Sequence, residues 1–315
     1  MVNSALWYRE FGAPEAVLRL ENAPPAALTA GNVRVAMRLA PVNASDLIPL
    51  SGAYRHRVVP PAVAGYEGVG VVTETTPGAE HLLGRRVLPL RGEGTWQRVV
   101  SCPAALVVPV PDAITDLQAA RAYINPLAAL LMLDLYNPAG RRVLLTAAGS
   151  DCGRLLGQWA LLRGAAEVAG ICRSPAHADT LAACGITPVM QSERTRIDQL
   201  AAAADIVFDA TGGALAQQLL EAMRPDGLFV CYGLLSGQPF TLQRRYPAVR
   251  WFHIRNCLAD IGTAQWQALF GRIWPLLAQS RCGGARIYPL EEWRAALALY
   301  RQPGRQVKPV MDLQP

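Results

Sequence analysis

The sequence predicts an α/β protein built from a β-rich domain and a domain with a doubly wound parallel sheet. A length of 315 residues is about twice that of an ordinary domain, so two domains are expected. The first third of the chain has short alternating polar and apolar runs and is dense in proline and glycine, which is typical of strands and turns. After about residue 119, continuous apolar runs alternate with helical segments, as in a parallel sheet covered by helices.

Short strands are expected throughout the β-rich part. Residues 33–39 alternate like a half-buried strand. The run 65–73 contains glycines that indicate a bend or a close backbone approach. Two shorter runs lie at 86–90 and 96–101.

The later part of the chain reads as strand–helix units joined by short loops, which predicts a doubly wound sheet. A helix over 119–136 precedes these units and contains Asn125-Pro126. The expected strands are 142–147, 167–172, 205–209 and 227–233, and the expected helices are 153–163, 176–184 and 214–223. An amphipathic helix from 263 to 279 and a strand at 307–311 follow.

Composition and charge exclude a membrane-spanning chain and make nucleic acid an unlikely partner. The apolar run 126–133 ends at Asp134 and is far shorter than the roughly 20 residues of a membrane helix. The formal net charge is +6, and all but one of the 30 cationic residues are arginine. These charges are scattered, and the densest clusters are only Arg55-His56-Arg57 and Arg244-Arg245, so a small anionic ligand fits better than nucleic acid.

The cysteines indicate reduced thiols in a cytoplasmic protein. Their number is seven, and neither a CxxC nor an HxxxH motif occurs. The spacing therefore predicts no zinc site. The N-terminal residues include Arg9 and Glu10 and no continuous apolar stretch, so no secretory signal is expected.

The segment that follows the strand at 142–147 resembles a phosphate-binding loop. Against the pattern Gly-x-Gly-x-x-Gly, Ala148 and Ser150 occupy the first two glycine positions and Gly153 the third. Small residues there allow the backbone to approach a pyrophosphate, and the helix N-terminus supplies N–H groups and a positive dipole. An ordinary tight turn without a ligand would show the same pattern.

Arg173, at the end of the next expected strand, favours NADPH over NADH. Dinucleotide enzymes that use NAD usually have an acidic residue at this point for the ribose 2′-hydroxyl, whereas arginine accommodates a 2′-phosphate. The segment Gly170-Ile-Cys-Arg-Ser174 contains no carboxylate. The alternative is a solvated surface arginine.

Several longer motifs, each occurring once, are distributed along nearly the whole chain. They are Pro41-Val-Asn-Ala-Ser-Asp46, Gly52-Ala-Tyr54, Pro61-Ala-Val-Ala-Gly-Tyr-Glu-Gly-Val-Gly70, Gly94-Thr-Trp-Gln97, Asn125-Pro-Leu127, Ala147-Ala-Gly-Ser150 with Gly153, and Tyr232-Gly-Leu-Leu-Ser-Gly-Gln-Pro239. As a set they resemble the medium-chain dehydrogenase/reductase superfamily, in its zinc-free branch of quinone oxidoreductases and 2-enoyl thioester reductases. The last motif and Gly94-Thr-Trp are most similar to the mitochondrial type of enoyl reductase.

This resemblance implies a split chain and a nucleotide cofactor. Residues 1–118 and 265–315 would form a GroES-like catalytic domain, and 119–264 a Rossmann domain, with NADPH in the cleft between them. The cofactor-binding residues that it implies are Ala148, Gly149, Ser150, Cys152, Gly153, Arg173, Ser174, Tyr232, Gly233, Leu234 and Lys308. It also implies a homodimer.

The resemblance implies catalytic roles for Tyr54 and Asn43. Tyr54 stands seven residues before Pro61, the spacing of the proposed proton donor in enoyl thioester reductases. When hydride adds to Cβ of a conjugated carbonyl compound, Cα must be protonated, and a positioned phenol can act as the general acid. The alternative is a loop aromatic packed on Pro60 or Pro61.

The implied substrate pocket contains Tyr54, Arg55, Tyr66 and Ala128, and several positions depart from the family pattern. Zinc-dependent members have Cys and His where this chain has Ala44 and Tyr66, so no metal is expected. Enoyl reductases typically have Asn in place of Tyr66, and many relatives have Thr in place of Ala128. The Arg55-His56-Arg57 cluster could bind a coenzyme A phosphate or a substrate carboxylate, or be a solvated loop.

Three functions follow from these observations. The leading one is an NADPH-dependent, zinc-independent reductase of an activated double bond, with a 2-enoyl thioester of coenzyme A or acyl carrier protein as first substrate. The second is an NADPH quinone or α,β-unsaturated ketone reductase. The third, of another class, is an NADPH-binding regulatory or RNA-binding protein without turnover.

Overall fold

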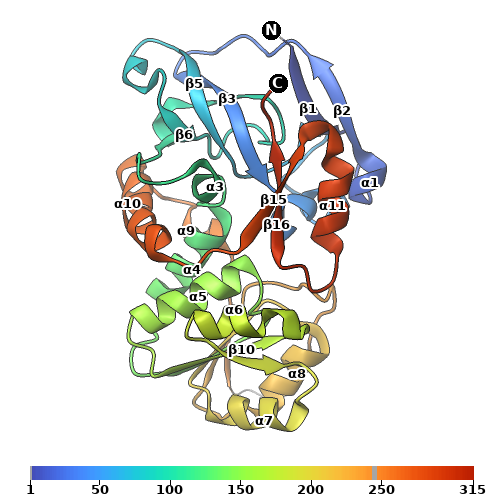
Figure 1. The fold of residues 1–315 in the computed structure, drawn as a ribbon, viewed down its shortest axis with the longest axis vertical. Helices are drawn as coiled ribbons and strands as arrows, with labels where there is room; N and C mark the ends of the chain where they lie inside the picture. Colours follow the sequence, from blue (N-terminus) through green and yellow to red (C-terminus); the bar gives the residue numbers. More distant parts are fainter. Residues whose placement is uncertain (1, 243–246) are drawn as a thin grey trace. The chain divides into compact units, whose positions relative to one another are not determined.

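Residues 2–242 and 247–315 are described by the computed structural model, and their contacts divide them into two units (Figure 1). The β-rich unit comprises Met1–Ile124, Gly262–Ala278 and Gly284–Pro315, and the parallel-sheet unit comprises Asn125–Ile261 and Gln279–Gly283. These limits differ by a few residues from the sequence-based limits at 118 and 265. The short segment 279–283, which belongs to the parallel-sheet unit, was not expected.

Among the described residues, the parallel-sheet unit contains a six-stranded sheet in the order β11-β10-β9-β12-β13-β14. The strands are β9 (Arg142–Leu145), β10 (Glu167–Cys172), β11 (Thr187–Met190), β12 (Ile206–Asp209), β13 (Leu228–Cys231) and β14 (Ala248–Trp251). Every neighbouring pair is parallel. In chain order this is 3-2-1-4-5-6, which confirms the doubly wound fold and places its switch point between β9 and β12.

Helices cover both faces of this sheet because successive residues of a strand point to opposite sides. Leu144 of β9 is buried in a cluster with residues of α7 (Arg194–Ala203) and α8 (Gly213–Ala222). The next residue, Leu145, packs on the other side against Gly157 of α5 (Asp151–Leu162). The continuous apolar strands seen in the sequence are therefore buried from both faces.

The β-rich unit contains two sheets. The larger has the order β15-β16-β3-β5-β6-β8, with β7 also paired to β3, and the smaller has the order β2-β1-β4. Their strands are β1 (Asn3–Tyr8), β2 (Leu18–Ala23), β3 (Asn32–Pro41), β4 (Ala62–Val63), β5 (Val69–Thr75), β6 (Arg86–Leu88), β7 (Val99–Pro103), β8 (Val108–Pro109), β15 (Gly284–Pro289) and β16 (Val307–Asp312). Helix α11 (Trp293–Arg301) packs on β16, and a buried core that includes Trp96 and Trp293 lies between these elements.

The helix expected over 119–136 is present over 124–135, and only its start was placed too early. The structure has two helices there, α3 (Asp116–Ala119) and α4 (Ile124–Leu135). Proline fits best in the first turn of a helix, where its missing N–H would have no partner within the helix, and α4 begins two residues before Pro126. The expected helix over 263–279 is confirmed as α10 (Thr263–Gln279).

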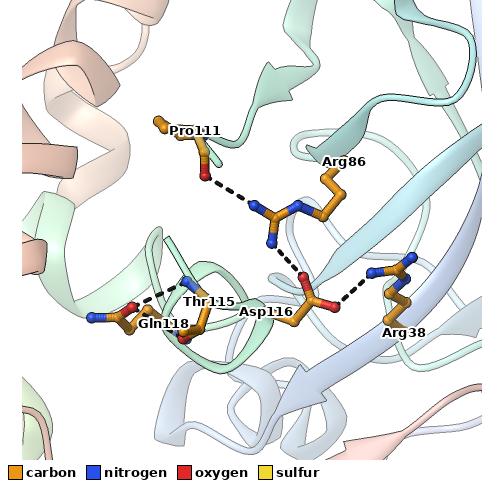
Figure 2. A network of polar contacts seen from close by, with 6 residues as sticks. All are labelled: Arg38, Arg86, Pro111, Thr115, Asp116 and Gln118. Carbon is orange, nitrogen blue, oxygen red and sulfur yellow. Dashed lines mark hydrogen bonds and ion pairs between the residues drawn. The ribbon is translucent and has the colours of Figure 1, made fainter. Parts of the chain in front are cut away.

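Figure 2 shows how α3, within the β-rich unit, is fixed to strands of the larger sheet. Thr115 caps the helix, since its hydroxyl accepts the N–H of Gln118 while the Gln118 side chain accepts the N–H of Thr115. Asp116 forms ion pairs with Arg38 of β3 at 2.8 Å and Arg86 of β6 at 2.7 Å. One carboxylate thus connects α3 to two strands of the larger sheet.

Within 2–242 and 247–315, no helix is both long enough and apolar enough to span a membrane.

Candidate active site

The loop between β9 and α5 lies at the switch point and contains most of the residues expected to contact a pyrophosphate. Ser150 caps α5, because its hydroxyl oxygen accepts the N–H of Gly153 at 3.1 Å. The N–H of Ala148 donates to the carbonyl of Ile171 at 3.0 Å and so attaches the loop to β10. Ala147 has φ 47°, a strained value for a residue with a Cβ and one that is frequent at functional turns.

Two glycines let the loop, the helix and the neighbouring segment approach closely. A Cβ on Gly153 would lie 2.8 Å from the Cα of Ala148. A Cβ on Gly149 would lie 2.6 Å from the ring of His177, a residue that the sequence analysis did not single out. The loop is therefore tightly packed and ends at the N-terminus of α5, the place where a Rossmann sheet binds a pyrophosphate.

A buried carboxylate beside this loop was also missed. Asp209, the last residue of β12, accepts hydrogen bonds from the Thr146 hydroxyl at 2.6 Å and from the N–H groups of Thr211 and Gly212. Burial raises the pKa of Asp209, and these hydrogen bonds oppose the shift. The network joins the carboxyl ends of β9 and β12, where the polar Thr146 and Asp209 at the ends of two apolar runs were the available signal.

Tyr232, Gly233 and Leu234 follow β13 at the same edge of the sheet. A Cβ on Gly233 would lie 2.9 Å from the carbonyl oxygen of Ala210, so the two loops are in close contact. Burial, with smaller effects of Cys152 and Asp209, raises the pKa of the Tyr232 phenol well above its usual range. Leu234 is exposed.

Arg173 directly follows β10, and its side chain is exposed. Ser174 caps the short 3₁₀ turn η4 (Pro175–His177), since its hydroxyl accepts the N–H of Ala176 at 3.3 Å. The guanidinium at the end of this strand can bind an anion bidentately.

The β-rich unit contains a buried polar network around Asn43. Lys308 of β16, the only lysine in the sequence, donates from Nζ to Oδ1 of Asn43 at 2.6 Å. The amide nitrogen of Asn43 donates in turn to Oε1 of Glu67 at 2.7 Å. All three residues are at most 4% exposed, so a chain of hydrogen bonds joins an amine, an amide and a carboxyl group in the interior.

Glu67 also fixes the start of α4. Its second oxygen accepts the N–H groups of Tyr123 and Ile124 at 3.1 and 2.7 Å. Burial raises the pKa of Glu67, while the hydrogen bond from Ile124, the charge of Lys308 and the amide of Asn43 oppose the shift. A carboxylate at a helix N-terminus is favourable, so Glu67 links the network to the helix that begins there.

Asp46 is the second carboxylate of this network. It accepts the N–H of Asn43 at 2.7 Å and the N–H of Tyr66 at 2.9 Å. Burial, together with the charge of Glu67, raises the pKa of Asp46 to about 7. The backbone of Tyr66, which stands in the family's zinc-ligand position, is thereby fixed.

Tyr54 lies half-buried in the turn that follows Gly52. The Cζ atom of Arg57 is 3.8 Å from the centre of its ring, and the His56 ring makes an edge contact with it. Arg55 donates to the carbonyl of Gly52 at 3.1 Å. The three cationic residues of the cluster are exposed, as a solvated loop or an anion-binding loop would have them.

The structure thus groups the expected site residues in two places. Ala148–Gly153, Arg173–Ser174 and Tyr232–Leu234 gather along the carboxyl edge of the parallel sheet, whereas Asn43 and Lys308 meet inside the β-rich unit. Tyr66 adjoins this second group, Tyr54 belongs to the loop at 52–57, and Ala128 is half-buried in α4. Their functional roles stay predictions.

Comparison with known proteins agrees with both units. Residues 29–112 match the alcohol dehydrogenase GroES-like domain family, and residues 152–271 match the zinc-binding dehydrogenase family. The chain is 32% identical to the mitochondrial enoyl-[acyl-carrier-protein] reductase of Arabidopsis thaliana over 254 residues, which are 76% of this chain and 68% of that protein. It is also 32% identical to the crystal structure of a proposed NADPH:quinone reductase from Bacillus thuringiensis, with a TM-score of 0.92 and 99% of each chain covered.

A third structure shares the fold at lower identity. The complex of Etr1p with NADP and crotonyl-CoA has a TM-score of 0.82 and 19% identity, covering 99% of this chain and all of that one.

A GroES-like unit joined to a Rossmann sheet with a glycine-lined helix N-terminus defines the class of two-domain dehydrogenases and reductases. The chain belongs to the medium-chain dehydrogenase/reductase superfamily, in its zinc-free branch of quinone oxidoreductases and enoyl reductases.

Although one matching family is described as zinc-binding, the described part of the chain contains no group of three or more His, Cys, Asp or Glu placed to bind a metal. Metal independence stays a prediction.

Proposed function

We propose that the protein is an NADPH-dependent reductase that adds hydride to an activated double bond, with a 2-enoyl thioester as its first substrate. The observation that carries this proposal is the β9–α5 loop at the switch point with Arg173 directly after the neighbouring strand, in a chain 32% identical to an enoyl-[acyl-carrier-protein] reductase. An NADPH-binding protein without turnover would keep the same edge, so the similarity to reductases is what favours an enzyme.

The residues at the carboxyl edge of the parallel sheet fit NADPH. The N–H groups at the start of α5 would hold the pyrophosphate, and the guanidinium of Arg173 would hold the 2′-phosphate. Gly149 and Gly153 let the loop and the first turn of α5 pack closely, since a Cβ on Gly149 would meet the His177 ring and one on Gly153 the backbone of Ala148. Bound NADPH supplies the hydride that adds to Cβ of the substrate.

In this proposal Tyr54 supplies the proton. Its phenol gives the proton to Cα as hydride adds to Cβ, and solvent then returns a proton to the phenolate. Contact with Arg57 on one face of the ring supports a defined orientation of Tyr54. The cationic side chains beside it would suit the phosphates of coenzyme A or the phosphopantetheine of an acyl carrier protein.

A quinone or an α,β-unsaturated ketone is the second candidate substrate. The similarity to a proposed NADPH:quinone reductase over 99% of both chains favours it, and so does Tyr66 where enoyl reductases typically have Asn. Such substrates need no contact with coenzyme A.

The test is NADPH oxidation with crotonyl-CoA, crotonyl-acyl carrier protein, a small enone and small quinones, each over a range of concentrations. We expect the highest kcat/KM with a thioester. A preference for quinones would replace the first substrate by the second. NADPH binding with no turnover of any of them would contradict the proposed reaction.

We also propose a homodimer in which a second copy adds to the edge of the parallel sheet. Among the described strands β14 is the last of the sheet, and its Trp251 is 60% exposed and stacked on Phe240 at 5.2 Å. Light scattering after size exclusion should give twice the chain mass, and Trp251→Glu should shift it to one chain mass.

The proposed compartment is the cytoplasm. None of the seven cysteines, all of which are described, takes part in a disulfide, which suits a reducing environment. The mitochondrial names of several relatives make organelle fractionation of the native protein the direct test.

A further inference from the structure

An ion pair lies in the first turn of α5, at the N-terminus that the proposed function assigns to the pyrophosphate. Asp151 is the first residue of the helix, and its Oδ1 atom is 2.7 Å from a terminal nitrogen of Arg154. The two side chains are only 15% and 8% exposed, so solvent screens this pair poorly.

Arg154 is held in place by the segment 279–283, which runs along α5. The indole of Trp159 donates to the Ser280 hydroxyl at 2.8 Å, and Gln158 exchanges hydrogen bonds with the backbone of Arg281. At the first turn, the guanidinium of Arg154 lies so close to Gly283 that no Cβ would fit there. The segment therefore follows the helix from its middle to its N-terminal turn.

Stability alone does not account for this arrangement. The Nε atom of Arg154 is buried without a hydrogen-bond partner, which costs free energy. An exposed acidic residue would complement the helix dipole equally well without a buried arginine.

The ion pair of Asp151 and Arg154 also affects how an anion would bind at this helix N-terminus. A pyrophosphate bound at this N-terminus would lie near the Asp151 carboxylate, and two like charges in a poorly screened site repel strongly. Arg154 supplies the compensating charge within the same turn.

We propose that Arg154 is a positioning residue for NADPH binding that acts by neutralising Asp151 at the N-terminus of α5. This inference rests on the proposed function, because it requires an anionic cofactor at that terminus.

The test is a titration of NADPH fluorescence without substrate, on four forms of the full chain: unmodified, Arg154→Met, Asp151→Asn, and the double variant. Arg154→Met should weaken NADPH binding at least tenfold. Asp151→Asn should bind NADPH as tightly as the unmodified protein or several-fold more tightly. This tenfold loss corresponds to 1.4 kcal/mol. The double variant should return to within about threefold of the unmodified protein, because it carries neither charge of the pair.

Arg163→Met is the matched control. It removes an ion pair with Asp134 at 2.9 Å from the opposite end of the same helix and should leave the Kd for NADPH unchanged. A thermal melt of each variant checks folding.

The outcomes separate the two proposals. If the unmodified protein does not bind NADPH, the proposed function fails and this inference fails with it. If it binds NADPH but the double variant stays as weak as Arg154→Met, Arg154 contacts the phosphates directly or supports the fold, and only this inference is overturned. Should Arg154→Met not fold, weaker binding by Asp151→Asn would overturn it equally.

Discussion

Lys308 donates a hydrogen bond to the side-chain oxygen of Asn43 over 2.6 Å, although the two residues are 265 positions apart in the chain. Because the Asn43 amide lies between an ammonium group and the Glu67 carboxylate, its oxygen must face Lys308 and its nitrogen must face Glu67. The orientation of this predicted catalytic residue is therefore set by charge on both sides.

Removing the ammonium should destabilise the protein strongly. Lys308→Met would leave two buried carboxylates without a cation, and breaking a buried charge pair typically costs about 3–5 kcal/mol. Urea unfolding at pH 7 measures the loss. Lys308→Met combined with Glu67→Gln removes the ammonium and the carboxylate nearest to it in the hydrogen-bonded chain, and should recover much of the loss. An equally unstable double variant would show that packing, not charge, makes Lys308 necessary.

Stability should depend on pH through Asp46. Its pKa is about 7 in the folded protein and about 3.9 when unfolded, so the folded state binds more protons between these values. This stabilising contribution is complete below about pH 4 and is lost as the pH rises through 7, by at most about 1.4 kcal/mol per pH unit. Asp46→Asn removes the titration. The difference in unfolding free energy between the two proteins should shrink from pH 5 to pH 8, and a constant difference would contradict the assignment.

Arg173 should select NADPH. The unmodified protein should be much more efficient with NADPH than with NADH, and Arg173→Ala should raise the KM for NADPH at least tenfold, about 1.4 kcal/mol. KM for NADH should hardly change, because NADH has no 2′-phosphate. Equal efficiency of the unmodified protein with both cofactors would refute this role.

Tyr54 should matter for carbon protonation and not for cofactor binding. Tyr54→Phe keeps the ring and its contact with Arg57 and removes the acid, so kcat with crotonyl-CoA should fall by roughly 10²–10⁴. The Kd for NADPH should not change, and quinone reduction, which needs no proton on carbon, should be much less affected. If the variant reduces crotonyl-CoA at the unmodified rate, the proton comes from water or another residue.

Metal content is a separate prediction, based on Ala44 and Tyr66 at the family's zinc-ligand positions. Elemental analysis should find far less than one zinc per chain, and chelators should leave activity and melting temperature unchanged. One tightly bound zinc per chain would require ligands that the sequence does not suggest.

The sequence predicted the parallel sheet well because its signals are local. The expected strand at 167–172 coincides with β10, and the expected helix at 153–163 differs from α5 by two residues at its start. The strand β11 and the helix α7 were not expected, since neither has a strong apolar period: β11 contains Pro188, and α7 buries only two residues, Ile197 and Ala201.

The buried network of the β-rich unit was not predictable in the same way. Asn43 and Lys308 were named from the resemblance, with catalytic and cofactor-binding roles, but nothing local indicates that they touch. Their contact follows from the antiparallel pairing of β16 with β3, in which Val310 stands opposite Pro41. Glu67 has its partners 24 to 57 positions away, in different elements, so only the tertiary structure reveals them.

The pairing of β16 with β3 also has a consequence for synthesis on the ribosome. Residues 39–41 of β3 pair with β16, and their neighbours 32–36 pair with β7, so part of that strand edge has no partner until residues 310–312 have been made. The hydrogen bond between Asn43 and Lys308 likewise cannot form until residue 308 has been made. Translation proceeds at about 5–20 residues per second, so for many seconds the nascent β-rich unit exposes a strand edge and an uncompensated carboxylate pair. All residues of the parallel-sheet unit, 125–261 and 279–283, precede β16, so this unit can complete its fold first. A ribosome-bound chain truncated before β16 should therefore be a chaperone client through its N-terminal part.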